Sequence, residues 1–244
     1  MNYKLTLSYD GTRYKGWQRQ GNTDNTIQSK IESTLGRITG ENIEVSGCGR
    51  TDAGVHALCQ VCSFHSNTEY SCSELLSLLR KYLPEDIGAL SLETAPERFH
   101  ARLSCRSKTY MYIIVTGDTP CVFDRKYVYR FDGAPDIEAM REAAGYLVGR
   151  HDFMAFCSLK SSKKSTVRTL ECIEIRENKD RIEILLTGDG FLYNMVRIIV
   201  GTLLEVGEGK RKPRELMDIL ESRDRMLAGF TAPPQGLFLY KITY

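Results

Sequence analysis

Apolar and polar side chains alternate along the first residues of the chain, with apolar side chains at positions 3, 5, 7 and 9. This period of two predicts a half-buried strand, which Asp10-Gly11 ends. Between positions 27 and 38, isoleucine and leucine recur at helical spacing. We expect a helix there, with Asn25 or Thr26 as its N-terminal cap and Gly40 at its end.

Similar patterns continue through the first half of the chain. Positions 43–45, 57–64 and 87–92 predict three further strands. Between the last two, leucines at helical spacing predict a helix that Ser73 caps and that stops before Pro84. The predicted order of the first half is therefore β-α-β-β-α-β.

The second half nearly repeats this order. Strands are expected at 108–115, 126–131, 166–175, 181–187 and 237–242, and helices at 135–148, at 192–204 and near Pro213. After one extra strand, the order is again β-α-β-β-α-β, which is the ferredoxin-like arrangement. The sequence predicts an α+β protein with two related ferredoxin-like halves, residues 1–105 and 106–244, a mainly antiparallel sheet and a central cleft.

Composition narrows the class of protein. The chain has 244 residues, of which 42% are hydrophobic and 26% charged, so we expect a folded chain with a sizeable core. The net charge is only +2, so any binding of nucleic acid must depend on local basic patches. The N-terminus lacks the apolar core of a signal peptide, and we expect a cytoplasmic protein.

Eight cysteines raise the question of disulfides or a metal site. Without a signal peptide we expect free thiols, because disulfides belong to oxidising compartments. Cys59 and Cys62 have CxxC spacing, but on a strand residues three apart point to opposite faces and cannot hold one ion. A second CxxC pair is absent from the sequence, so no metal is expected.

A glycine-rich segment at 47–56 contains the best candidate for a catalytic residue. It holds Asp52 two residues after Arg50, between two expected strands. In an extended segment those side chains lie on the same side, and a neighbouring arginine favours the ionised carboxylate. Such a carboxylate can act as a nucleophile or a base. Spacing alone also fits a structural ion pair, which is the commoner role for an Arg-x-Asp sequence.

Six ordered segments resemble the TruA family of tRNA pseudouridine synthases, and the resemblance extends over almost the whole chain. They are Gly16-Trp17-Gln18-Arg19-Gln20 with Thr26-Ile27-Gln28, the run from Gly49 to Ala57, Phe99-His100-Ala101-Arg102, Lys108-Thr109-Tyr110-Met111-Tyr112, Phe191 to Arg197 with Gly201 to Gly207, and Ala232-Pro233-Pro234-Gln235-Gly236-Leu237.

The resemblance implies an activity and site residues. It implies an isomerase that breaks the N1–C1′ bond of a uridine, rotates the base and rejoins it through C5. Asp52 matches the family's catalytic aspartate, Tyr110 its base-stacking tyrosine, and Arg50 and Arg197 its active-site arginines. The implied substrate is the anticodon stem-loop of tRNA at positions 38, 39 and 40. No metal or organic cofactor is implied, and the implied assembly is a homodimer.

The residue chemistry is compatible with these roles. Tyr110 shares a predicted strand face with Tyr112, which is usual for core tyrosines, but an extruded base also needs an aromatic surface. Arg197 is the only charged residue between Gly190 and Leu204 and needs a partner, for which Asp52 is the candidate. Alternatively, the Arg197 guanidinium reaches water along its stem. For His56 we expect a packing or supporting role.

RNA binding requires basic residues that hold phosphates while the uridine leaves its stack. Three clusters are candidates, although each is by itself also typical of a solvated face. The first interleaves basic and aromatic residues, the second lies in a serine-rich stretch, and the third precedes a helix: they are Arg13, Lys15, Trp17 and Arg19; Lys160, Lys163, Lys164 and Arg168; and Lys210, Arg211, Lys212 and Arg214.

Two rival functions stay open at this point. A non-catalytic RNA-binding module would keep the fold and the basic patches but would have no use for the segment around Asp52. A hydrolase with an aspartyl nucleophile would need a positioned water and often a metal, and no second carboxylate stands beside Asp52. The sequence leaves undecided whether Asp52 attacks C6 of the base, attacks C1′ of the ribose or removes a sugar proton.

Overall fold

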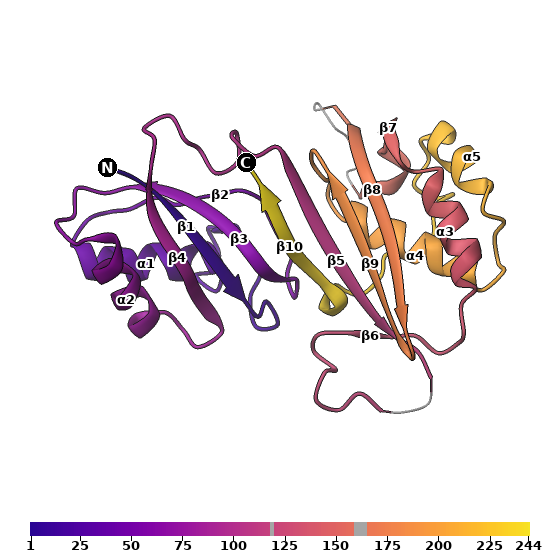
Figure 1. Cartoon of the computed structure of the whole chain (residues 1–244), viewed down its shortest axis with the longest axis horizontal. Helices are drawn as coiled ribbons and strands as arrows, with labels where there is room; N and C mark the ends of the chain where they lie inside the picture. The colour runs from indigo at the N-terminus through magenta and orange to yellow at the C-terminus, as the bar shows by residue number, and fades with distance from the viewer. Residues whose placement is uncertain (118–119, 159–164) are drawn as a thin grey trace. The chain divides into compact units, whose positions relative to one another are not determined.

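A computed structural model describes residues 1–117, 120–158 and 165–244. The chain forms two compact units, the first made of residues 1–106 with 238–244 and the second of residues 107–237 (Figure 1). We expected residues 238–244 in the second half, but they belong to the first unit. The architecture is mixed α+β with mainly antiparallel strand pairs, as the sequence predicts.

The first unit consists of four strands in one path, a short added strand and two helices. Its strand path is β4-β1-β3-β10, and β2 pairs with β3. β1 is antiparallel to both β3 and β4, whereas β10 is parallel to β3. The bounds are β1 Asn2–Tyr9, α1 Ile27–Thr39, β2 Ser46–Gly47, β3 His56–His65, α2 Cys72–Tyr82, β4 Ile87–Ala95 and β10 Leu237–Thr243.

Periodicity explains how these elements pack. The apolar residues of β1 are fully or almost fully buried, which matches the alternation in the sequence. In α1, the Thr26 hydroxyl accepts a hydrogen bond from the Ser29 amide, and Gly40 ends the helix with a φ of 73°. Figure 1 shows α1 and α2 side by side next to the strands of this unit.

Two local predictions in the first unit are wrong. α2 is capped by Ser71, not Ser73, because Ser71 and Glu74 form a reciprocal capping box. Residues 43–45 do not form a strand, although Ile43 and Val45 are buried. The Val45 amide donates to Glu32, and its carbonyl accepts from Gln28, so side chains of α1 take the bonds that a neighbouring strand would supply.

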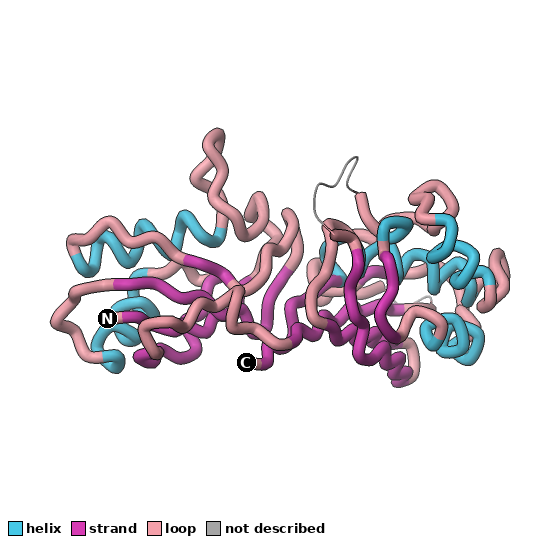
Figure 2. The backbone as a smooth tube through the Cα atoms, turned by 90° about the horizontal axis from the view of Figure 1, so that it is seen from above, coloured by secondary structure: helices cyan, strands magenta, loops and turns pink. Residues whose placement is uncertain are grey.

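The second unit has a strand path β5-β9-β8-β7 with antiparallel neighbours, and β6 runs parallel to β5. In Figures 1 and 2 its three helices gather beside these strands, and α3 packs against both α4 and β8. The bounds are β5 Ser107–Val115, β6 Tyr129–Arg130, α3 Ile137–Gly145, β7 Gly149–Asp152, β8 Val167–Asn178, β9 Arg181–Gly188, α4 Met195–Gly207 and α5 Glu215–Ser222, with short 3-10 turns at Met154–Phe156 and Pro234–Gly236.

Element ends differ from the predictions in this unit. Asp136 caps α3, which ends at Gly145, while Gly149 opens the unpredicted strand β7 with a φ of 113°. The expected strand at 126–131 shrinks to β6, because a turn occupies 122–127. α4 begins at Met195, three residues later than expected, since Asn194 takes a left-handed φ of 61°.

Within the described residues, no helix is long and apolar enough to cross a membrane. None of the eight cysteines forms a disulfide. Cys62 is buried on β3, and burial raises the pKa of its thiol. It is therefore inert as a nucleophile in this state.

Candidate active site

The 49–55 loop connects β2 to β3 and carries Asp52. The Asp52 carbonyl accepts a hydrogen bond from the Val55 amide at 3.1 Å, which closes a turn. The preceding residue, Thr51, is buried, and its hydroxyl lies 2.8 Å from the hydroxyl of Tyr9 on β1. The Asp52 side chain is only half-buried. The loop therefore has a buried anchor immediately beside a carboxylate that reaches the surface.

A second buried polar residue fixes the start of the loop. Gln60 on β3 is 0% exposed and donates to the Gly49 carbonyl at 2.8 Å. Its side-chain oxygen accepts from the Gly49 amide at 3.4 Å and the Val61 amide at 3.2 Å. Gln60 was not among the residues predicted from the sequence, although a glutamine inside the apolar run 57–64 is a usable sign of a buried polar contact.

The segment after β1 packs closely against the same loop. The Trp17 amide donates to the Thr51 carbonyl at 3.0 Å. A Cβ atom at Gly16 would lie 2.7 Å from that carbonyl oxygen, and one at Gly11 would lie 2.0 Å from the Val55 carbonyl oxygen. Both positions therefore need glycine, because the two backbones are in contact.

Trp17 does not offer an RNA-binding surface. Its side chain is 2% exposed and fills the space over Gly47, where a Cβ atom would lie 2.4 Å from the indole. Its ring also packs 6.1 Å from that of Tyr9, centroid to centroid. The expectation that Trp17 contacts RNA is therefore wrong for this conformation, because the indole is a core group that supports the 49–55 loop.

His56 follows the loop and is also buried. Its ring stacks on Phe238 with centroids 4.8 Å apart, and its Nδ1 atom accepts from the Gly11 amide at 3.1 Å. The same Nδ1 lies 3.2 Å from a carboxylate oxygen of Asp10. These contacts agree with the packing and supporting role expected for His56.

Arg50 does not form the ion pair that its spacing from Asp52 suggested. Its side chain is exposed, and in the part of the chain that the structure describes it has no carboxylate within ion-pair distance.

Tyr110 lies on β5 in the second unit, opposite Leu186 of β9. Its ring meets that of Phe191 edge to face, with centroids 5.0 Å apart and planes at 77°. Two residues further along β5, Tyr112 is fully buried and donates to the Pro233 carbonyl at 2.7 Å. Phe191, which follows β9, thus holds the Tyr110 ring from its side.

Arg197 projects from the first turn of α4. Its guanidinium donates to the Ala232 carbonyl at 2.6 Å and to the Asn194 side-chain oxygen at 2.9 Å. The Ala232 amide donates back to the Arg197 carbonyl at 3.0 Å. These bonds join α4 to the 230–236 segment. The expected pairing of Arg197 with Asp52 involves residues of different units, and it stays a prediction.

The predicted phosphate contacts differ in how they are paired. Arg13 binds Asp86 at 2.6 Å, and Arg19 binds Glu32 at 3.1 Å, whereas Lys15 is exposed. Arg168 donates to the Ser165 and Val167 carbonyls. Lys160, Lys163 and Lys164 lie outside the described residues.

No metal site accompanies these residues: among side chains with described positions, no group of three or more His, Cys, Asp or Glu could hold a metal ion.

Comparison with known proteins identifies the family. The family described as "tRNA pseudouridine synthase" matches residues 6–104 and 143–244. The chain is 48% identical over 243 residues to "tRNA pseudouridine synthase A" of Bacillus sp. (strain KSM-64), covering 100% of this chain and 99% of the relative. It is 47% identical to the protein of the same name from Clostridium acetobutylicum, with the same coverage. The chain therefore belongs to the tRNA pseudouridine synthase family.

Proposed function

We propose that this member of the tRNA pseudouridine synthase family isomerises uridine to pseudouridine in the anticodon stem-loop of tRNA, at positions 38, 39 and 40. In this proposal Asp52 is the catalytic residue. Tyr110, Arg50 and Arg197 contact the extruded nucleotide, and no metal or organic cofactor takes part. The full-length similarity to proteins named tRNA pseudouridine synthase A supports the reaction class.

The support of the 49–55 loop is the observation that favours Asp52 most directly. Thr51 and Gly49, one and three residues before Asp52, are fixed by the buried residues Tyr9 and Gln60. A catalytic carboxylate gains from such fixation, because an error of about 1 Å in its position can cost about a hundredfold in rate. A structural carboxylate on a surface loop would not need this support.

The isomerisation needs no outside reagent. The N1–C1′ bond of uridine breaks and a C5–C1′ bond forms, while the proton lost from C5 is balanced by the proton gained at N1. A carboxylate can assist as a nucleophile, at C6 of the base or C1′ of the ribose, or as a base toward a sugar proton. Asp52 can serve any of these three routes.

Each proposed substrate contact binds the nucleotide in a different way. Only 7% of Tyr110 is exposed in the free chain, and Phe191 holds its ring from the side. An extruded base would stack on the part of the ring that is accessible, and a base–aromatic stack contributes about 1–3 kcal/mol. Arg50 is exposed and makes no ion pair within the described ranges, so its guanidinium can meet a phosphate or the base. Arg197 has a guanidinium already oriented by Ala232 and Asn194.

Several basic residues complete the proposed RNA contacts. Arg13 and Arg19 are exposed but must exchange or share their carboxylate partners to bind phosphate, whereas Lys15 can bind directly. Arg168, Lys163 and Lys164 form the second proposed cluster. Each contact would contribute through the release of counterions from the RNA, so affinity should fall as salt rises.

The remaining parts of the proposal concern assembly and architecture. We propose a homodimer that works in the cytoplasm, as the family resemblance implies. We also propose that the chain contains two ferredoxin-like repeats. In the first, β4-β1-β3 with β2 paired to β3 has the strand order of that fold. In the second, β5, α3, β8, β9, α4 and β10 follow each other in the matching order.

Replacement of Asp52 tests the proposed function. Asp52→Asn and Asp52→Ala should abolish pseudouridine formation, by about a thousandfold or more, while the Kd for tRNA stays within about threefold. Pseudouridine in bulk tRNA is mapped after incubation with each variant. Asp24→Asn is the matched control, because Asp24 is an exposed loop aspartate in the same unit.

Other outcomes would favour the rival functions. Pseudouridine formation by Asp52→Ala at the native rate would remove Asp52 from catalysis. Tight tRNA binding without any pseudouridine formation by the native chain would favour a non-catalytic RNA-binding module. Release of free uracil or of RNA fragments would favour a hydrolase.

A further inference from the structure

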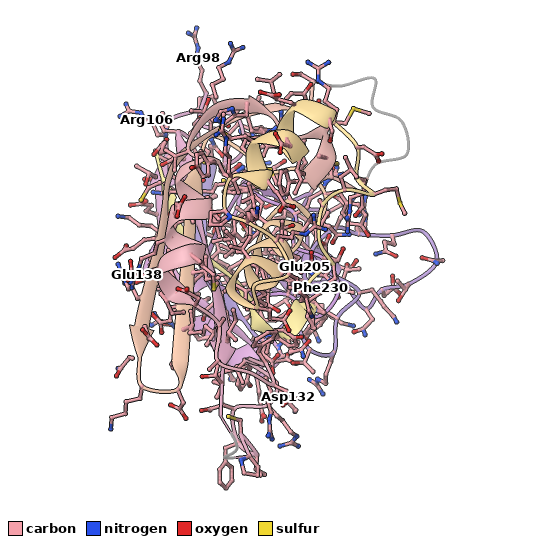
Figure 3. All side chains as sticks on the ribbon, turned by 90° about the vertical axis from the view of Figure 1, so that its right-hand side faces the viewer. Arg98, Arg106, Asp132, Glu138, Glu205 and Phe230 are labelled. Carbon is pink, nitrogen blue, oxygen red and sulfur yellow. The ribbon has the colours of Figure 1, made fainter. Side chains whose placement is uncertain are left out.

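The 98–106 loop, here called the arginine loop, carries three exposed arginines that the three predicted basic clusters do not include. They are Arg98, Arg102 and Arg106. Figure 3 shows Arg98 and Arg106 pointing away from the ribbon. Leu103 lies between them in sequence and is 80% exposed, which makes it one of the most exposed large apolar residues of the described chain.

The backbone of the arginine loop is fixed by its own hydrogen bonds. The His100 ring nitrogen Nδ1 accepts from the amides of Arg102 and Leu103, at 3.1 and 3.3 Å. The His100 amide donates to the Ser104 hydroxyl, and the Ser104 amide donates to the His100 carbonyl. The loop is therefore a closed turn with an exposed tip.

The loop is also tied to the body of the first unit from below. The Ala101 amide donates to the Ser63 hydroxyl at 3.1 Å, and the Ala101 carbonyl accepts from the Tyr244 hydroxyl at 2.8 Å. The buried Asn2 side chain donates to the Pro96 and Phe99 carbonyls, at 2.9 and 2.8 Å. The loop therefore has a fixed backbone beneath exposed side chains.

The three arginines differ from several others in this protein. In the part of the chain with described positions, none of them has a carboxylate within ion-pair distance. Arg13, Arg19 and Arg211, by contrast, each have one. The one acidic neighbour in sequence, Glu97, contacts His65 at 3.1 Å instead. Residues 98–106 contain no acidic residue. The loop thus presents concentrated positive charge that no internal carboxylate neutralises.

We propose that the arginine loop is a contact surface for the sugar-phosphate backbone of tRNA, with Arg98, Arg102 and Arg106 binding phosphates and Leu103 packing on a sugar or base. The proposal rests on the proposed function, since it assigns a further part of the same substrate to this chain. Guanidinium groups match phosphate in a two-pronged geometry. Because the loop backbone is already ordered, binding costs less conformational entropy.

Neutralising the three arginines together tests this surface. The variant Arg98→Gln/Arg102→Gln/Arg106→Gln should bind tRNA at least tenfold more weakly near 0.1 M salt, and the slope of log Kd against log salt should fall by roughly two to three. The matched control is Lys81→Gln/Arg176→Gln/Lys241→Gln, which removes the same charge from exposed positions elsewhere and should leave the slope unchanged. Thermal unfolding establishes that both variants fold.

Replacing the same arginines by lysine separates charge from geometry. Arg98→Lys/Arg102→Lys/Arg106→Lys should keep the native salt slope but bind tRNA a few-fold more weakly, because lysine lacks the two-pronged group. His100→Ala should weaken binding without altering the charge, because it releases the tip of the loop.

The proposal would be overturned if the glutamine variant and its control had the same tRNA affinity and salt slope. It would also be overturned if the glutamine variant lost binding to phosphatidylserine vesicles while its tRNA binding stayed native, because the surface would then serve a membrane. A native chain that binds tRNA but forms no pseudouridine would overturn the proposed function instead, and the binding measurements would still decide the role of the loop.

Discussion

The regions around Asp52 and Arg197 are held in place by different kinds of interaction. The 49–55 loop depends on two buried polar side chains: Tyr9 bonds to the Thr51 hydroxyl, and Gln60 bonds to the Gly49 backbone. Arg197 stands on α4, a helix whose residues are almost all buried and mostly apolar. Its hydrogen bonds to Ala232 and Asn194 orient the guanidinium. A surface loop thus needs hydrogen-bonded support, whereas a helix obtains its position from packing.

One feature is common to the two regions, a glycine that lets backbones touch. Gly11 contacts Val55 at the end of the 49–55 loop, and Gly201 of α4 contacts Phe230, where an added Cβ would lie 1.9 Å from the carbonyl oxygen. In each case the obstacle is backbone, which cannot rotate away as a side chain can. The comparison predicts that an alanine at Gly201 disturbs packing, while one at Gly11 disturbs the loop that carries Asp52.

The largest effect is expected from Gly201→Ala. The new methyl group forces α4 away from the 228–232 segment, and overpacking of this kind costs about 2–4 kcal/mol. Urea unfolding measures the loss. Gly145→Ala is the control, because a Cβ at that position meets nothing within 4 Å, and it should change stability by less than about 1 kcal/mol. Equal stability of the two variants would show that α4 can shift freely.

Gly11→Ala should cost somewhat less stability but more activity. Displacement of the Val55 carbonyl moves the loop that carries Asp52, so we expect kcat to fall by about a hundredfold with a smaller change in KM. Steady-state pseudouridine formation measures both. Gly21→Ala, which meets nothing within 4 Å, should behave as the native chain does. Native kcat in Gly11→Ala would contradict the link between loop position and catalysis.

Gln60→Leu tests the polar support of the loop without adding a group in contact with it. Leucine fills a similar volume but leaves the Gly49 carbonyl without its 2.8 Å bond, at a cost of about 1–3 kcal/mol. We expect kcat to fall about tenfold or more while the Kd for tRNA stays native, because the buried Gln60 side chain bonds to Gly49 and is not a proposed RNA contact. Gln20→Leu, at an exposed position, should alter neither quantity. A loss confined to tRNA affinity would assign Gln60 to the RNA-binding surface instead.

The difference between the two regions also explains which features the sequence predicted. Periodicity located the strands β1, β3, β5 and β9 and the helix α4, because burial imposes a regular pattern. Periodicity failed where side chains replace the backbone of a neighbouring strand as hydrogen-bond partners. This occurs at Val45, whose amide and carbonyl bond to side chains of α1. It also failed at element ends such as Asn194, where a single left-handed residue sets the start of α4.

The candidate site was predicted only in part for the same reason. Motif resemblance pointed to Asp52, Tyr110 and Arg197, since each stands in a distinctive local run. It could not show that Trp17 lies under the 49–55 loop or that Gln60 bonds Gly49, because both contacts join residues more than ten positions apart. Nor could spacing show that Arg50 makes no ion pair with Asp52 within the described residues, because two charged residues in one loop need not bring their charged groups together.

The smallest expected effect concerns two buried tyrosines, one in each region. Burial raises the pKa of Tyr9, against the opposing influence of its bond to Thr51, and burial raises the pKa of Tyr112, against the opposing charge of Arg197. Both keep their proton in the folded chain at a pH where the unfolded chain, with an ordinary tyrosine pKa of about 10, loses it. The stability that they contribute is therefore complete below about pH 10 and is lost as pH rises toward the folded pKa.

Urea unfolding at about pH 8 and about pH 10.5 measures this loss. Each buried tyrosine should account for roughly 1 kcal/mol of the decrease at the higher pH, and Tyr9→Phe and Tyr112→Phe should each reduce the decrease by that amount. Tyr82→Phe, at an exposed position, should leave it unchanged. Tyr9→Phe should in addition lower kcat, because it releases Thr51 beside Asp52, whereas Tyr112→Phe releases only the Pro233 carbonyl. Equal effects of the two replacements on kcat would mean that the polar support of the loop has no special part in catalysis.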